Sequence, residues 1–127
     1  MRDYEIFNID SLPLQSGTTL REAKLAYKTY GRLNAARDNV VVLPTFFGGQ
    51  HTQNEGMIGE GRAIDPSKYF IIVPNMFGNS VSTSPSNATP PYNRARFPNV
   101  SLYDNVSAQH RLITQVFGIE KIALVTG

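Results

Sequence analysis

The most informative segment of this sequence is Lys121-Ile122-Ala123-Leu124-Val125-Thr126-Gly127. Its apolar and β-branched residues predict a short buried strand, and a glycine closes it. In a catalytic α/β sheet, a strand of this kind turns sharply into a helix, and the turn carries the nucleophile. The segment therefore predicts that the chain stops where a nucleophile-bearing turn would begin.

Two earlier segments have the same signature. Residues 40–43 and 70–73 are continuously apolar and rich in β-branched side chains, as expected for strands covered on both faces. A helix is predicted between the second of these strands and the last one. Ser101 is a good N-cap, Asp104 completes a capping box three positions later, and Gly118 ends the helix.

The apolar residues of this helix mostly share one stripe, which consists of Val106, Leu112, Ile113, Val116 and Phe117. Strand, crossover helix and strand in succession are typical of a parallel α/β sheet.

The first thirty residues follow a different pattern. Residues 4–10 alternate between apolar and polar, residues 12–17 form a turn, and residues 20–30 predict a second strand. These two strands are expected to pair antiparallel at an edge of the sheet. The predicted fold class is therefore α/β, with antiparallel edge strands followed by parallel strands and a crossover helix.

Two long loops follow the first two buried strands. The loop at 47–66 is expected to contain a helical turn near 57–63, and the loop at 75–100 is rich in Ser, Asn and Pro. Long loops after strands are where α/β proteins usually place their ligand sites. The sequence therefore predicts a site among these loops.

Composition narrows the class of protein. With 127 residues, 41% apolar and 17% charged, the chain is an ordinary globular domain or part of one. The net charge is +2 and the basic residues are scattered, which argues against a nucleic-acid surface. The absence of cysteine excludes disulfides, thiolate metal sites and a cysteine nucleophile. No signal peptide and no apolar run of membrane-spanning length is present, so a cytoplasmic protein without membrane contact is expected.

The segment Phe46-Phe47-Gly48-Gly49-Gln50-His51 follows the first buried strand. Its glycines allow a tight turn that points backbone N–H groups into a cleft, as an oxyanion hole requires. An ordinary glycine turn fits the pattern equally well. His51 is a candidate for lining the pocket, whereas His110 is expected on the surface of the helix. Neither histidine has a metal-ligand partner at a useful spacing, and no G-x-S-x-G motif is present.

A family resemblance runs along almost the whole chain. The matching segments are residues 25–31 (LAYKTYG), 33–35 (LNA), 61–65 (GRAID), 68–72 (KYFII), 75–78 (NMFG), 82–86 (STSPS), 97–104, 108–109 and 118–120. In their order and spacing they resemble the N-terminal third of the homoserine O-acetyltransferase family. The resemblance implies that residues 1–127 are an incomplete α/β-hydrolase-fold domain.

The resemblance also implies a chemistry. In this family a serine is acylated by acyl-CoA, and the acyl group passes to an alcohol, so no cofactor is implied and acyl-CoA is a possible co-substrate. Gly127 matches the residue that opens the serine turn, so the Ser-His-Asp triad is expected beyond this chain. Phe47 matches the residue whose backbone N–H binds the oxyanion, and Phe46, Gly48, Gly49 and His51 are the candidate substrate-binding residues beside it.

The loop departs from the family pattern. The family usually has His-Ala-Leu-Thr-Gly where this chain has Thr45-Phe46-Phe47-Gly48-Gly49. Two aromatic side chains would reshape the acyl pocket, so a hydrolase or a transferase that uses another alcohol fits as well as homoserine acylation.

Two hypotheses follow. In the first, the chain is the N-terminal part of an acyltransferase or hydrolase, inactive alone and prone to self-association through its open sheet edge. In the second, it is a standalone, non-catalytic α/β binding or interaction module.

Overall fold

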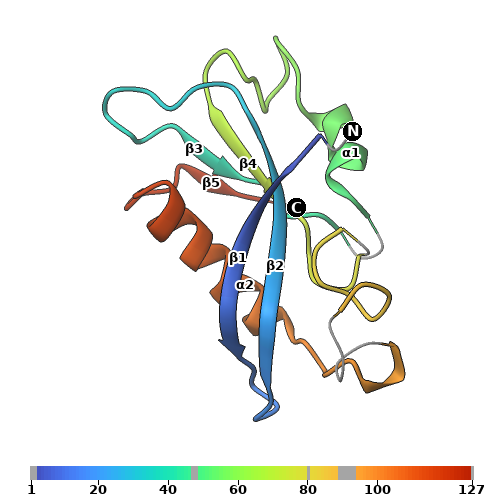
Figure 1. Cartoon of the computed structure of the whole chain (residues 1–127). Coiled ribbons are helices and arrows are strands. Elements are labelled where there is room, and N and C mark those ends of the chain that lie inside the picture. Colours follow the sequence, from blue (N-terminus) through green and yellow to red (C-terminus); the bar gives the residue numbers. More distant parts are fainter. Residues whose placement is uncertain (1–2, 47–48, 80, 89–93, 127) are drawn as a thin grey trace.

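The computed structural model describes residues 3–46, 49–79, 81–88 and 94–126. Within these residues one sheet contains five strands in the order β1-β2-β4-β3-β5, as Figure 1 shows. The strands are β1 (Glu5–Pro13), β2 (Thr19–Tyr30), β3 (Val40–Val42), β4 (Phe70–Pro74) and β5 (Leu124–Val125). β1 pairs antiparallel with β2 and β2 with β4, whereas β3 is parallel to β4 and β5. The predicted fold class is confirmed.

The two central strands are buried on both faces, as their continuous apolar pattern predicts. Every residue of β3 and β4 is buried. Because successive side chains of a strand point to opposite faces, Val40 and Val42 contribute to the core on one side of the sheet, and Val41 to the core on the other. This central pair separates two apolar layers.

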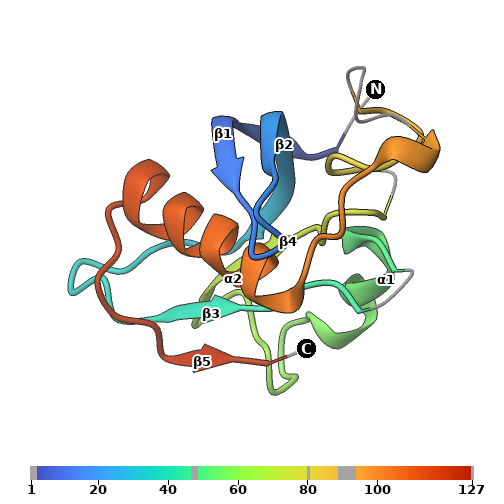
Figure 2. The same cartoon turned by 90° about the horizontal axis from the view of Figure 1, so that it is seen from below.

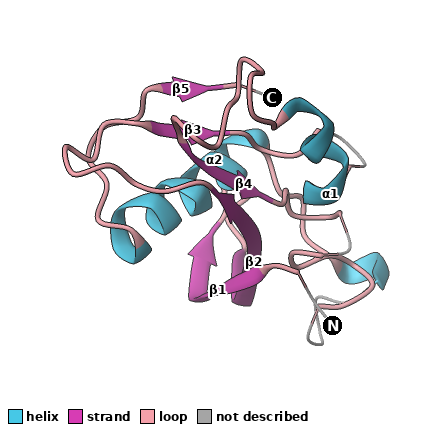
Figure 3. Cartoon of the chain, turned by 90° about the horizontal axis from the view of Figure 1, so that it is seen from above, coloured by secondary structure: helices cyan, strands magenta, loops and turns pink. Residues whose placement is uncertain are grey.

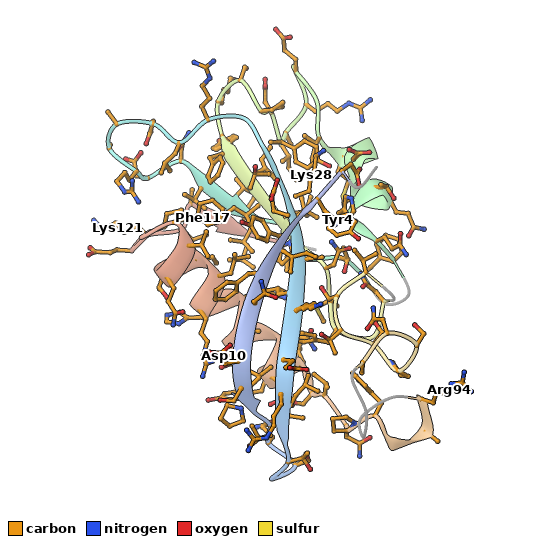
Figure 4. The ribbon with its side chains drawn as sticks, in the orientation of Figure 1. Tyr4, Asp10, Lys28, Arg94, Phe117 and Lys121 are labelled. Atoms are coloured by element: carbon orange, nitrogen blue, oxygen red, sulfur yellow. The ribbon has the colours of Figure 1, made fainter. Side chains whose placement is uncertain are left out.

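The helix α2 (Leu102–Arg111) covers one of these faces and continues as the π-helical turn η3 (Leu112–Val116). Its N-terminus is held as predicted, since the Asp104 N–H donates to Ser101 Oγ at 3.1 Å and the Ser101 N–H donates to Asp104 Oδ2 at 2.8 Å. The aromatic ring of Phe117, which follows η3, packs edge-on against Phe70 of β4. Figure 4 labels this ring, which anchors the helix end to the sheet.

The short helix α1 (His51–Asn54) and the 3-10 turn η1 (Glu55–Met57) lie beyond the end of β3, away from α2 (Figure 2). A second 3-10 turn, η2, spans Arg94–Arg96. The helical turn expected near 57–63 therefore occurs earlier in the loop. The reason is local, because Gln50 and Gln53 cap each other at the start of α1.

The expectation that the last strand is buried is wrong. Leu124 and Val125 are 47% and 59% exposed, because β5 has β3 on one side and forms the sheet edge of the described residues. Two members of the predicted helical stripe, Val106 and Val116, are also exposed. β5 and this flank of α2 therefore form an open apolar side of the domain. Among the described residues, no helix is long and apolar enough to cross a membrane.

Candidate functional site

The loops that follow β3 and β4 run side by side at the carboxyl ends of these strands (Figure 3). The N–H of Thr45, which follows β3, donates to the carbonyl of Pro74 at 3.1 Å. In return the N–H of Met76, which follows β4, donates to Thr45 Oγ1 at 3.0 Å. Ligand sites of open α/β sheets lie at this edge, so the predicted location of the site agrees with the observed topology.

A groove with a volume of about 490 Å³ opens at this edge and runs between α2 and β5. A second groove of about 340 Å³ adjoins it and shares the side chains of Phe46, Met76 and Leu102 with it. The polar residues of the larger groove are Thr45, Gln109 and His110. Among the described residues that line the two grooves, no Lys, Arg, Asp or Glu is present. The described lining of the larger groove is therefore mostly apolar.

Phe46 stands between the two grooves with a half-exposed ring. Its carbonyl accepts a hydrogen bond from the Gly49 N–H at 2.8 Å, which closes a turn. A Cβ on residue 49 would lie 2.7 Å from the Phe46 ring, so this ring packs directly over a glycine. Gly49 therefore makes room for Phe46, and its N–H is used within the turn. Phe47 and Gly48, the residues predicted to provide the oxyanion hole and part of the substrate site, lie outside the described residues, as does Gly127.

His51 is the first residue of α1, and its side chain is buried. Its Nε2 is 2.8 Å from Asp3 Oδ1, and its Nδ1 is 3.1 Å from Asn75 Nδ2. These partners assign the proton to Nε2, because the Asn75 amide donates to Nδ1 and the Asp3 carboxylate accepts from Nε2. The ring of Tyr4 meets the His51 ring edge-on at 5.6 Å, and Figure 4 shows Tyr4 beside α1. The prediction that His51 contacts a substrate stays a prediction.

The hydrogen bond from His51 lowers the pKa of the Asp3 carboxyl below its ordinary value. The carboxylate therefore stays charged at neutral pH and ties the start of the chain to α1. His110, as expected, is exposed on α2, and it also lines the larger groove.

Two asparagines complete the site and were not identified as site residues from the sequence. Asn75 follows β4 directly, is fully buried, and accepts the backbone N–H of His51 at 3.0 Å through Oδ1. Asn79 donates from Nδ2 to the Gly49 carbonyl at 3.1 Å and to Asn75 Oδ1 at 2.9 Å. An asparagine directly after a fully buried strand was the available signal, because a buried amide must find partners on a neighbouring loop.

The described fold and site define the class of protein. A sheet with two antiparallel edge strands, a parallel centre, and loops gathered at the carboxyl ends of β3 and β4 is the N-terminal part of an α/β-hydrolase fold. The solved structure of the acetyl esterase MekB superimposes on 96% of this chain with a TM-score of 0.93 and 47% identity, and the match covers 36% of that chain.

Curated relatives agree with this class. The chain is 47% identical over 125 residues to an ethyl acetate hydrolase from Pseudomonas veronii. That match covers 98% of this chain and 36% of the relative. It is 43% identical over 118 residues to a homoserine O-acetyltransferase from Chlorobium chlorochromatii. That match covers 87% of this chain and 33% of the relative. No protein-family model matches the sequence. The chain is homologous to the N-terminal part of the esterases and homoserine O-acetyltransferases, and it spans about a third of the length of the curated relatives it matches.

Proposed function

We propose that this chain provides the oxyanion-loop side and the apolar wall of a serine esterase site that hydrolyses short, uncharged carboxylic esters. The observation that carries the proposal is the groove at the ends of β3 and β4, which is lined mostly by apolar side chains, with Thr45, Gln109 and His110 as its polar residues. The 47% identity to a protein named ethyl acetate hydrolase supports it.

The reaction needs a serine that attacks the ester carbonyl, a histidine that takes the serine proton, and an acid that orients the histidine. We place this triad in the part of the fold that the relatives have beyond the matched third. The acyl-enzyme forms as the alcohol leaves, and water then releases the acid. The loop after β3 would supply backbone donors to the oxyanion, as the sequence predicts for Phe47.

The described groove lining supports hydrolysis over transfer to homoserine. Homoserine carries an ammonium and a carboxylate, and acyl-CoA carries phosphates, so both need oppositely charged partners when they are bound in a low-dielectric site. Among the described lining residues none is a Lys, Arg, Asp or Glu. Acyl transfer from acyl-CoA to an alcohol is the second candidate, which the 43% identity to a homoserine O-acetyltransferase favours.

A chimaera tests the proposal. The matched third of the ethyl acetate hydrolase is replaced by this chain, and the product is assayed with p-nitrophenyl acetate and butyrate and with acetyl-CoA plus homoserine. We expect hydrolysis of the acetate ester and no measurable acetylation of homoserine. Acetylation of homoserine that outpaces ester hydrolysis would overturn the proposal. The chain alone, under the same conditions, is expected to match a heat-denatured sample, because covalent catalysis needs an activated nucleophile.

The same chimaera tests the role of Phe46. Phe46→Ala is expected to raise the butyrate-to-acetate ratio of kcat/KM by about tenfold, since a pocket discriminates by about 1–3 kcal/mol for each methylene it accepts or rejects. Tyr103→Ala is the matched control, because Tyr103 is exposed on α2 and does not line either groove. An unchanged ratio in Phe46→Ala would show that this ring does not bound the acyl group.

A further inference from the structure

The loop between β3 and α1 is held on both sides of residues 47–48, which lie outside the described residues. On the strand side, Asn54 Nδ2 donates to the carbonyls of Leu43 and Pro44 at 3.3 and 3.2 Å. On the helix side, the Gly49 carbonyl accepts from Asn79 and the His51 N–H donates to Asn75. The described residues on both sides of 47–48 are therefore held by side-chain amides.

The Asn75 amide is the centre of the helix-side contacts. Its Oδ1 accepts from the His51 N–H and from Asn79 Nδ2, and its Nδ2 donates to the Ala26 carbonyl at 3.2 Å and approaches His51 Nδ1 at 3.1 Å. The residue is fully buried, and both of its polar atoms have partners. One neutral side chain therefore links β2, the end of β4 and the start of α1.

Asn79 extends this link to the loop itself. Its Nδ2 donates to the Gly49 carbonyl and to Asn75 Oδ1, whereas its Oδ1 accepts from the N–H groups of Val81 and Ser82 at 3.0 and 3.1 Å. Gln50 Nε2 adds a donation to the Asn79 carbonyl at 3.3 Å. The Nδ2 group of Asn79 thus holds the loop after β3 through Gly49. Its Oδ1 holds the loop after β4 through Val81 and Ser82.

We propose that Asn75 and Asn79 are positioning residues, which form an amide bridge that fixes the start of α1 and Gly49, the residue over which the groove-lining ring of Phe46 packs. This inference rests on the proposed esterase function for its chemical consequence. The bridge is uncharged, so it orients the loop without adding a charge that would compete for the oxyanion. Asn75 is fully buried and Asn79 is partly buried, and the polar side-chain atoms of both are engaged, so rearranging them is expensive.

Asn79→Asp separates the two halves of the bridge. The substitution keeps Oδ1 for Val81 and Ser82 but replaces the Nδ2 donor by an oxygen, which repels the Gly49 carbonyl and Asn75 Oδ1. Amide hydrogen exchange is measured by NMR on the full 127-residue chain. The amides of Gly49 and His51 are expected to exchange at least tenfold faster than in the unmodified chain.

Three comparisons make this result specific. The Val81 and Ser82 amides should stay protected in Asn79→Asp and lose protection in Asn79→Ala, which removes both halves. The Leu43 amide, which donates to the Ile72 carbonyl within the sheet, should not change in either variant. Asn99→Asp adds the same charge at an exposed position and should leave all these amides unchanged. Unchanged exchange at Gly49 and His51 in Asn79→Asp would overturn the amide bridge.

The chimaera gives the catalytic readout. Asn79→Asp is expected to lower kcat for p-nitrophenyl acetate at least tenfold with KM changed less than threefold, measured per active site titrated. If Asn79→Asp accelerates amide exchange at Gly49 and His51 but leaves kcat unchanged, the positioning role is overturned. An inactive chimaera without any substitution would instead contradict the proposed function, while the exchange experiment would still decide the bridge.

Discussion

The antiparallel side of the sheet and its parallel edge differ in how completely they are packed. On the antiparallel side, Leu12, Leu20 and Leu25 of β1 and β2 have no exposed surface. At the other edge, β5 consists of two residues that are about half exposed. β5 is wholly apolar and is nevertheless exposed, so neighbouring elements rather than apolar content determine the burial. Strands with neighbours on both sides or a covering helix therefore supply the packed core, whereas β5 contributes little to it.

The largest expected effect compares one leucine from each side. Leu25→Ala should lower the free energy of unfolding by about 3 kcal/mol, because a fully buried side chain leaves a cavity. Leu124→Ala should change it by less than about 0.5 kcal/mol, because Leu124 is half exposed. Urea unfolding of both variants measures the difference. Equal losses of unfolding free energy in the two variants would show that the two edges of the sheet are equally packed.

A second effect concerns the end of β2. Gly31 has φ +79°, and a Cβ there would lie 2.1 Å from the Tyr69 carbonyl oxygen, so Gly31→Ala should cost about 3 kcal/mol. Gly17, with φ +94° and open space around it, is the matched control, and Gly17→Ala should cost only about 1 kcal/mol of backbone strain. The same urea experiment measures both. Similar costs would show that the contact between β2 and the chain before β4 is not tight.

A smaller effect depends on pH and concerns the start of the chain. The pKa of Asp3 is lowered by its hydrogen bond from His51, so its contribution to stability is present above the ordinary carboxyl pKa of 3.8 and is lost as pH falls through the lowered value. Asp3→Asn should therefore lower Tm at neutral pH, and the difference from the unmodified chain should vanish in acid. Asp10→Asn, at an exposed position on β1, is the control (Figure 4). A difference that persists in acid would contradict this assignment.

The smallest effect on stability is expected at β5, the open edge of the described sheet. Substitutions there should instead change how strongly the chain self-associates. Unpaired strand edges with apolar side chains pair with other chains, so we expect the 127-residue chain to self-associate through β5. Val125→Lys should shift the sedimentation profile toward monomer without lowering Tm. Met57→Lys, at an exposed position in η1 outside β5, should leave the profile unchanged. A monomeric unmodified chain would contradict the expectation.

Much of the fold could be predicted from the sequence. The capping box at Ser101 and the runs at 40–43 and 70–73 identified α2, β3 and β4, because these signals are local and depend on neighbouring residues. The alternation at 4–10 identified β1, although the strand extends further, to Pro13. The predicted location of the helical turn was wrong, because the local Gln50–Gln53 capping pair starts α1 earlier in the loop. The predicted burial of β5 was wrong, because burial depends on which elements lie beside the strand.

The candidate site could be predicted only in part. The sequence indicated the loop at Phe46 and Gly49, and the described structure places Phe46 in the groove lining, with Gly49 packed against its ring. It suggested a substrate contact for His51, whose ring the structure places against Asp3 and Asn75. It did not identify Asn75 and Asn79 as site residues, because an amide side chain takes its role from partners that lie tens of residues away along the chain.

The sequence by itself determined the strand and helix pattern, the segment around Phe46 as the candidate site, and the homology to esterases and homoserine O-acetyltransferases. Periodicity, caps and motifs are properties of neighbouring residues, so they can be identified without coordinates. Only the tertiary structure decided which apolar residues are buried, that the grooves are uncharged among the described lining residues, and that two asparagines hold the β3 loop. These properties depend on which distant segments come together, and the packing of the sheet fixes that.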